Sequence, residues 1–290
     1  MKDYQFTNNI KGNTIRRKSF NELAEFTFDI NFERWYQAGF WGDNYIAYAL
    51  LDGEKVIANA SITKSELVIN EKTYQTIQIG TVMTAPDYQG KGLSRQLVER
   101  ILTDYQNKVD FIYLFANETV LDFYPKFGFK RVDELLIKKE LTEKRTQKSG
   151  LTKVTFSEVQ DEVEAIIKNA DKSHLQSYLL DDKNLKLFYY GTVFSEEFYY
   201  IKELNVYLCF EIEENRLDLF DVLTNKPISM KAILDYLPLE NITDIYYHFD
   251  LKEKEGLFYE VAPCDEDALF TLGIDSEVLE SVKLPFFNHA

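Results

Sequence analysis

The sequence IGTVMTAPDYQGKGLSRQLVERILTDY, residues 79–105, contains the pattern from which the rest of the chain is interpreted. It begins as an apolar, β-branched run and breaks at Ala85-Pro86-Asp87. After two glycines, Gly90 and Gly92, apolar residues follow at helical spacing: Leu93, Leu97, Val98, Ile101 and Leu102. The pattern predicts a strand, a glycine turn and a helix.

A helix that starts on a glycine turn has unpaired backbone N–H groups and a partial positive charge at its first turn. Such an end binds anions, phosphate above all, and glycines let the main chain come close to a ligand. The side chain of Lys91 adds positive charge there or points into water. The spacing matches neither GxxxxGK[ST] nor GxGxxG, because Arg95 stands three residues after Gly92. A turn without a ligand is the alternative interpretation.

Two motifs in this region resemble those of the GCN5-related N-acetyltransferase (GNAT) superfamily. Val82-Met83-Thr84 followed by Gln89-Gly90-Lys91-Gly92-Leu93-Ser94 is similar to the acetyl-CoA loop Q/R-x-x-G-x-G/A, with Ser94 in place of the last small residue. Residues 117–129, NETVLDFYPKFGF, resemble the second signature N-x-x-A-x-x-x-Y-x-K-x-G-F, with Val120 in place of the small residue. The resemblance covers about residues 1–140.

The resemblance implies transfer of an acetyl group from acetyl-CoA to a primary amine on an α/β fold with a mixed α+β sheet. It implies that the backbone of residues 82–84 pairs with the pantetheine arm and that a backbone N–H near Met83 stabilises the oxyanion. Tyr124 is then the acid that protonates the departing thiolate, and its other interpretation is a packing tyrosine. The expected cofactor-binding residues are Val82, Met83, Thr84, Gln89, Gly90, Lys91, Gly92, Leu93, Ser94 and Asn117.

The general base is left open by the sequence. Many family members use a strand carboxylate, but the strand 74–82 offers only Gln75 and Gln78, and an amide cannot accept the proton. The alternatives are a water chain, no base at all, or one of four carboxylates: Glu22, Glu25, Glu33 and Asp43.

Composition restricts the class of protein. A length of 290 residues predicts about two domains. The two cysteines, Cys209 and Cys264, and the three separated histidines predict neither a disulfide framework nor a metal site. The N-terminal segment has no apolar export core, and no run approaches the length of a membrane span, so a cytoplasmic protein is expected.

The charge is unevenly divided along the chain. Residues 1–150 carry 21 Lys and Arg against 20 Asp and Glu, whereas residues 151–290 carry 12 against 28. Nucleic-acid binding is not expected, because phosphate contacts require a basic surface. An acidic half would attract a small cationic amine as substrate, or it would only confer solubility. A free sheet edge would support a homodimer.

The first half predicts hairpins followed by crossovers. The expected helices are 19–28, a short helix within 31–42 that is followed by an aromatic loop, and 118–123. The expected strands are 44–51, 55–62, 65–69, 74–82, 111–115 and a closing strand 129–140. The turns Asp52-Gly53 and Asn70-Glu71-Lys72 join the hairpins.

The second half repeats the first in reduced form. Residues 217–224, LDLFDVLT, match 77–84, a helix is expected over 228–237, and residues 244–249, DIYYHF, match 110–115. No glycine occurs between Asp218 and Asp250. We therefore expect a GNAT domain over 1–142, a polar linker over 143–151 and a degenerate GNAT-like acidic domain over 152–290. Chance similarity of strands is the competing interpretation.

Two other functions compete with a small-molecule acetyltransferase. The first is a catalytically incomplete protein that binds or senses acyl-CoA, which the missing strand carboxylate favours and Tyr124 disfavours. The second is a protein acetyltransferase that modifies a lysine side chain or an N-terminus. Among the small-molecule acceptors, the expected cleft is bordered by Trp35, Trp41 and the acidic second half.

Overall fold

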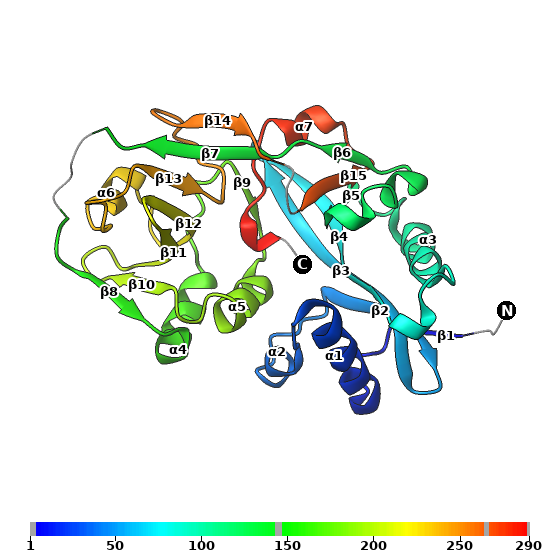
Figure 1. The fold of residues 1–290 in the computed structure, drawn as a ribbon. Helices are drawn as coiled ribbons and strands as arrows, with labels where there is room; N and C mark the ends of the chain where they lie inside the picture. The colour runs from blue at the N-terminus through cyan, green and yellow to red at the C-terminus, as the bar shows by residue number, and fades with distance from the viewer. Residues whose placement is uncertain (1–3, 143–146, 264–266, 289–290) are drawn as a thin grey trace.

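Two mixed sheets organise the computed structural model, which describes residues 4–142, 147–263 and 267–288 (Figure 1). In the first sheet the strand order is β1 (Gln5–Thr7), β2 (Tyr45–Asp52), β3 (Lys55–Ile69), β4 (Lys72–Thr84), β5 (Phe111–Ala116), β15 (Ala268–Leu272) and β6 (Lys130–Val132). The short strand β9 (Ser177–Leu179) also pairs with β3. Strands β4 and β5 are parallel, and the other neighbours are antiparallel.

The second sheet has the order β14 (Phe258–Val261), β7 (Leu135–Glu140), β13 (Asp244–Tyr247), β12 (Arg216–Leu223), β11 (Val206–Glu213), β10 (Phe198–Ile201) and β8 (Leu151–Val154). Its parallel pair is β12 with β13, the segments that the sequence matched to β4 and β5. The fold is therefore a mixed α/β fold in which two sheets fit a duplicated unit.

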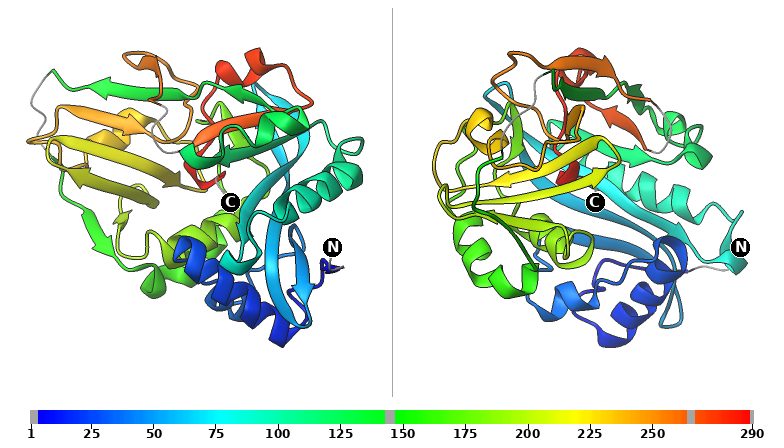
Figure 2. Two further views of the ribbon diagram at one scale, coloured as in Figure 1. Left: turned by 45° about the vertical axis from the view of Figure 1, so that its right-hand side comes forward. Right: turned by 60° about the vertical axis from the view of Figure 1, so that its left-hand side comes forward.

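The two sheets exchange a strand. Strand β7 leaves the first half and pairs with β13, while β15 from the end of the chain pairs with β5 and β6 (Figures 1 and 2). The prediction of one closing strand over 129–140 was wrong, because β6 and β7 belong to different sheets. An apolar strand pattern shows that a segment is buried, but not which sheet takes it.

The helices flank these sheets. They are α1 (Thr14–Phe28), α2 (Glu33–Gln37), α3 (Leu93–Tyr105), α4 (Phe156–Ile167), α5 (Lys183–Thr192), α6 (Met230–Leu234) and α7 (Ser276–Glu280). Helix α1 starts five residues before the predicted Ser19, because the Asn13 side chain caps it by accepting from the N–H groups of Ile15 and Arg16. No helix in the described ranges has the length and apolar character needed to cross a membrane.

The predicted helix over 118–123 was also wrong. The structure has 3₁₀ turns at Glu118–Val120 and Tyr124–Phe127 instead. Asn117 accepts from the N–H of Thr119 and begins the first turn, and Pro125 in the second turn has no N–H to continue a helix. Further 3₁₀ turns lie at Pro86–Tyr88 and Phe286–Asn288.

The two faces of the first sheet have different cores. The apolar side chains of α3 pack on Ile77, Ile79, Ile112 and Leu114. A second cluster, formed by α1, α2 and β2, is aromatic and contains Phe20, Phe32, Trp35, Trp41 and Tyr45. Helix α5 of the second half lies near α2, with the Trp35 and Phe188 rings 5.7 Å apart.

The division into residues 1–142 and 152–290 stays a prediction, because each sheet takes a strand from across that boundary. Residues 143–146 of the expected linker, together with Cys264 and His289, lie outside the described ranges. Leu151, expected to end the linker, is the first residue of β8.

Candidate active site

Strand β4 is distorted where it would otherwise continue beside β5. The β3–β4 register shifts between Asn59 and Ser61, and Thr81 of β4 has φ of 49°. A left-handed backbone is a rare conformation for a β-branched residue and is typical of functional sites. The Tyr45 hydroxyl lies 2.9 Å from Thr81 Oγ1, and Asn59 Nδ2 donates to the Thr81 carbonyl at 2.9 Å. These contacts fix the bulge in place.

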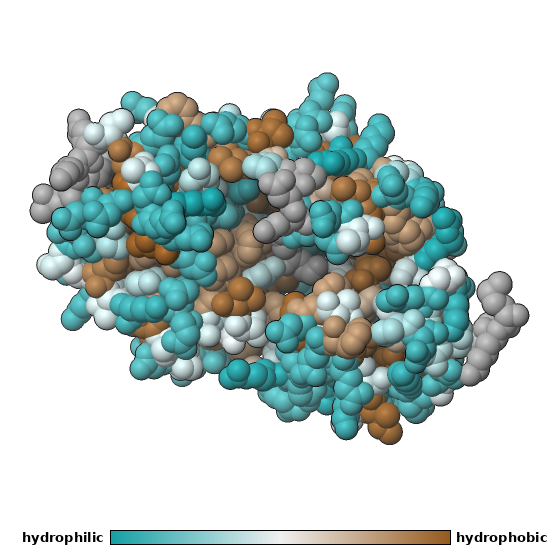
Figure 3. Space-filling view, viewed as in Figure 1, coloured by the Kyte–Doolittle hydropathy of each residue, from teal (hydrophilic) through white to brown (hydrophobic). Residues whose placement is uncertain are grey.

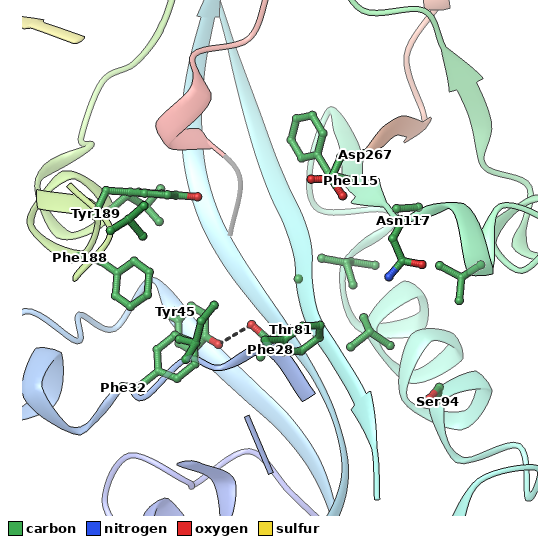
Figure 4. A pocket seen from close by; sticks show the side chains of 18 of the residues that line it. Phe28, Phe32, Tyr45, Thr81, Ser94, Phe115, Asn117, Phe188, Tyr189 and Asp267 are labelled. Carbon is green, nitrogen blue, oxygen red and sulfur yellow. Dashed lines mark hydrogen bonds between the residues drawn. The ribbon is translucent and has the colours of Figure 1, made fainter. Parts of the chain in front are cut away.

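The bulge separates β4 from β5. Their pairing ends at Ile79 and Leu114, although β4 continues to Thr84 and β5 to Ala116. Strands that part in this way leave backbone groups available to an extended ligand. A cavity of about 550 Å³ lies at this point, and Figure 4 shows side chains on both sides of β4 that line it.

The cavity has walls from both halves of the chain. The first half contributes Phe28, Ile30, Phe32, Trp35, Tyr45, Ile79, Gly80, Thr81, Val82, Ser94, Phe115, Ala116, Asn117, Val120, Phe123 and Tyr124. The second half contributes Leu185, Phe188, Tyr189, Val193 and Asp267. In the view of Figure 3, apolar residues border a hollow near the middle of the molecule.

The glycine turn leads from β4 into α3. Gly90 and Gly92 have φ of 71° and 73°, and a Cβ added at either would meet nothing within 4 Å. Gly92 is the N-cap of α3 and brings no side chain to cap the helix, so no side-chain cap occupies the first-turn amides. Ser94 Oγ lies 2.8 Å from Thr84 Oγ1, which ties the helix start to the strand end.

Lys91 does not extend into the cavity. Its ammonium donates to the Asp87 carbonyl at 2.6 Å and lies 4.5 Å from the centre of the Tyr88 ring. Gln89 Nε2 donates to the Thr84 carbonyl at 3.3 Å. Both side chains are therefore bonded within the turn, and the backbone amides are the groups that the turn can offer to an anion.

Tyr124 lies on the cavity wall. Its ring packs against Phe129 and against Phe270 of the exchanged strand β15. Burial raises the pKa of its hydroxyl to about 12, so the group is protonated at neutral pH. A protonated phenol beside the gap between β4 and β5 can act as an acid.

Asn117 also lines the cavity, at the end of β5. Its Oδ1 accepts from the Thr119 N–H at 3.1 Å and from the Thr119 hydroxyl at 2.6 Å. Those bonds fix the amide in the orientation seen in Figure 4. Asn117 thus starts the 3₁₀ turn Glu118–Val120, which precedes the turn that begins at Tyr124.

The predicted residues fall into two groups. Val82, Ser94, Asn117 and Tyr124 meet at the cavity. The remaining predicted residues, Thr84 and 89–93, form the neighbouring turn, while the Met83 side chain is buried in the aromatic cluster. Any contact of Met83 with a substrate is therefore through its backbone.

None of the four proposed carboxylate bases lines the cavity. Glu33 pairs with Arg17 at 2.8 Å and Asp43 with Lys11 at 2.9 Å. Glu25 accepts from Asn31 at 2.5 Å, and Glu22 lies 3.8 Å from Lys18. The pairing with Arg17 lowers the pKa of Glu33, which makes it a weaker base still.

Trp41 and the acidic wall expected from the second half are likewise absent from the lining. Trp41 is buried in the aromatic cluster. The second half contributes apolar and aromatic side chains of α5, and Asp267 is its one acidic lining residue in the described ranges. Sequence reasoning missed Asp267 and α5 because the strand exchange that brings Asp267 there has no local signal.

Comparison with known proteins supports this interpretation of the first half. Residues 14–132 match the acetyltransferase (GNAT) domain family. A chloroplastic GCN5-related N-acetyltransferase 2 of Arabidopsis thaliana is 42% identical over 53 residues, which is 18% of this chain and 20% of the plant protein. The chain thus matches only a small part of that relative.

Solved structures resemble nearly the whole chain. A conserved protein of Enterococcus faecalis V583, described as a probable N-acyltransferase, superposes with a TM-score of 0.63 at 14% identity. The superposition covers 93% of this chain and 72% of the Enterococcus chain. Eis1 of Mycobacterium abscessus superposes with a TM-score of 0.56 at 13% identity. The superposition covers 92% of this chain and 73% of the Eis1 chain. At such low identity these two structures support the fold alone. With its two signatures and its family match, the segment of residues 14–132 is a GNAT domain, and the fold of the whole chain resembles that of GNAT structures.

Proposed function

We propose that the protein transfers the acetyl group of acetyl-CoA to the primary amine of a small cationic molecule. One observation carries the proposal: a side-chain-free helix start at Gly92 and a buried phenol at Tyr124 flank the same gap between β4 and β5. The amides of the turn would hold the diphosphate, and the free edge of β4 would pair with the pantetheine.

The chemistry follows from these positions. The amine nitrogen attacks the thioester carbonyl carbon, and a backbone N–H near Met83 stabilises the charge on the oxygen. The C–S bond then breaks, and Tyr124 donates its proton to the sulfur. A substrate that binds as an ammonium must lose a proton before its nitrogen can attack, and Asp267, the carboxylate that lines the cavity in the described ranges, would accept that proton. The second N–H proton leaves as the amide forms and would return to the Tyr124 oxygen. A cytoplasmic location and a homodimer are part of this proposal.

Two alternatives differ in class. A protein that only binds acyl-CoA would keep the turn and the gap but would show no turnover. A protein acetyltransferase would need a groove for a peptide, whereas the walls here surround a cavity of about 550 Å³. That volume is within the range of small-molecule sites, which favours a small acceptor.

The test is thermal unfolding with and without acetyl-CoA, followed by thiol release in the presence of polyamines, aminoglycosides, amino acids and aromatic amines. Acetyl-CoA is expected to raise the melting temperature, because a ligand that binds only the folded state stabilises it. Absence of a shift at millimolar acetyl-CoA would overturn the proposal. A shift without thiol release for any amine would support the binding protein instead.

A further inference from the structure

The cavity has two chemically different ends. Val82, Ser94 and Asn117 lie at one end, beside the glycine turn and the ends of β4 and β5. Phe188 and Tyr189 of α5 lie at the other end, together with Phe32, which lies next to Phe188 (Figure 4). If the first end holds the thioester, the second end is where the acceptor must lie.

The acceptor end is built from aromatic rings that hold each other. Phe32 and Phe188 stack with ring centres 5.4 Å apart and planes 16° apart. Trp35 contacts the edge of Phe188 at 5.7 Å, and its Nε1 donates to the Asn184 carbonyl at 2.9 Å. Side chains of the first half of the chain therefore contact α5 of the second half along this wall. A fixed apolar wall recognises an apolar body of matching size.

One carboxylate stands among these apolar side chains. In the described ranges Asp267 is the only lining residue with a charged side chain. It directly precedes β15, where Ala268 pairs with Ala116 at the end of β5. In the view of Figure 4, Asp267 lies beside Phe115, with Tyr189 on one side and Asn117 on the other. The carboxylate thus lies between the aromatic end and the thioester end.

We propose that the acceptor is a primary amine with a single positive charge on an aromatic or branched apolar body. Its ammonium group meets Asp267, and its body packs against Phe32, Phe188 and Tyr189. This inference rests on the proposed acetyltransferase function and narrows its substrate class. A second ammonium group, as in a polyamine, would lose its hydration against these rings, where the lining of the described ranges offers no carboxylate besides Asp267, and rings alone compensate for little of that cost.

Two amines of equal heavy-atom count make the first comparison. Hexylamine and 1,5-diaminopentane differ only in whether the far end is a methyl or an ammonium group. We expect kcat/KM to be about 10- to 100-fold higher for hexylamine, since the described lining offers the second charge no carboxylate besides Asp267. Phenethylamine should be at least as good as hexylamine because its ring can stack. A diamine that equals or exceeds hexylamine would overturn the inference.

Variants locate the effect. Phe188→Ala should lower kcat/KM for phenethylamine about 10- to 100-fold. Asp267→Asn should raise its KM about 10-fold or more and, because it also removes the proposed proton acceptor, lower its kcat. Both should keep the melting-temperature shift given by acetyl-CoA. Phe258→Ala, which removes a half-exposed ring of β14 that does not line the cavity, is the matched control and should change neither quantity. Loss of phenethylamine turnover equally in all three variants would contradict the assignment.

The failures are distinguishable. No thermal shift with acetyl-CoA would remove the proposed function and this inference together. A normal shift with turnover of spermidine or an aminoglycoside, but not of phenethylamine, would leave the function standing and overturn the inference. A normal shift with no turnover of any of these amines would also overturn it.

Discussion

The two sheets differ most at the point where their strands would hold a cofactor. In the first sheet the bulge at Thr81 opens a cavity between β4 and β5. In the second sheet the register of β11 and β12 also shifts, beside Cys209, but Asp221 at that shift is bonded to side chains of α5. Lys186 Nζ lies 2.6 Å from Asp221 Oδ2, and the Tyr190 hydroxyl donates to the same oxygen.

Helix α5 lies between the two sheets and presents a different face to each of them. Leu185, Phe188 and Tyr189 line the cavity at the first sheet, while Lys186 and Tyr190 fill the corresponding point of the second. Residues three and four apart share a helix face, so the alternation follows from helical geometry. The first sheet thus has an open site, and the corresponding point of the second sheet is filled by the helix that also lines this site.

The largest expected effect is on catalysis in the first sheet. Tyr124→Phe removes the acid and should lower kcat about 100- to 10,000-fold, while the shift in melting temperature with acetyl-CoA is retained. Steady-state kinetics with a turned-over amine measures this. The matched change in the second sheet, Tyr190→Phe, should leave kcat near the wild-type value. Equal losses in both variants would break the distinction between an open and a filled site.

The next effect is on stability in the second sheet. Burial opposes the charge of Lys186, but Asp221 and Asp182 outweigh it and raise its pKa. Lys186→Met leaves a buried carboxylate without its cation and should lower the free energy of unfolding by about 3–5 kcal/mol in denaturant titration. Lys252→Met, which breaks an exposed pair with Glu71 at 3.4 Å, should cost under about 1 kcal/mol. Similar losses of unfolding free energy in the two variants would show that the buried pair of Lys186 with Asp221 stabilises the fold no more than an exposed pair does.

Acid should weaken the second half through His174. Both of its ring nitrogens are buried without a partner in the described ranges, and burial lowers its pKa to about 4. Between the unfolded pKa of about 6.5 and the folded value, the unfolded chain binds the proton and the folded chain does not. Stability should therefore fall by about 3 kcal/mol as the pH drops from about 6.5 to about 4.

Denaturant titration of wild type and His174→Asn at several pH values measures that slope. The variant should lose this part of the pH dependence, and at pH 8 the difference between the two proteins should no longer change with pH. An unchanged slope below pH 6.5 would assign the acid sensitivity to other groups.

The smallest effect separates backbone strain from ligand contact. Gly92 and Gly53 both have positive φ, 73° and 66°, and both have open space where a Cβ would be. Alanine at either position should cost about 1–2 kcal/mol of unfolding free energy. Only Gly92→Ala should also weaken acetyl-CoA binding, by about 5- to 30-fold in calorimetry, because its methyl group meets the ligand. Equal affinities would argue against a diphosphate at the turn.

Local patterns in the sequence predicted the first half well. The Asp52-Gly53 hairpin, the glycine turn and α3 are confirmed, because each depends on residues close together in the chain. The predicted strands 55–62 and 65–69 are the two parts of one long strand, β3. The match of 217–224 to 77–84 is consistent with the parallel pairing of β12 with β13.

Long-range features could not be predicted in the same way. The sequences of residues 135–140 and 268–272 contain no pattern that predicts the exchange. The first segment pairs in the second sheet and the second segment in the first sheet. Asp267 reaches the cavity only through that exchange. The strained conformation of Thr81 is also invisible in a β-branched run, because tertiary contacts to Tyr45 and Asn59 impose it.

The exchange of β7 and β15 also bears on how the chain is made. Ala116 of β5 pairs with Ala268, so the sheet that carries the site lacks an inner strand until most of the polypeptide has left the ribosome. Strand β7, already synthesised, must meanwhile wait for β13 with its edges unpaired. Such pairing between distant segments slows folding and exposes edges that aggregate. We therefore expect the nascent chain to fold slowly and to need protection of these edges from aggregation during synthesis.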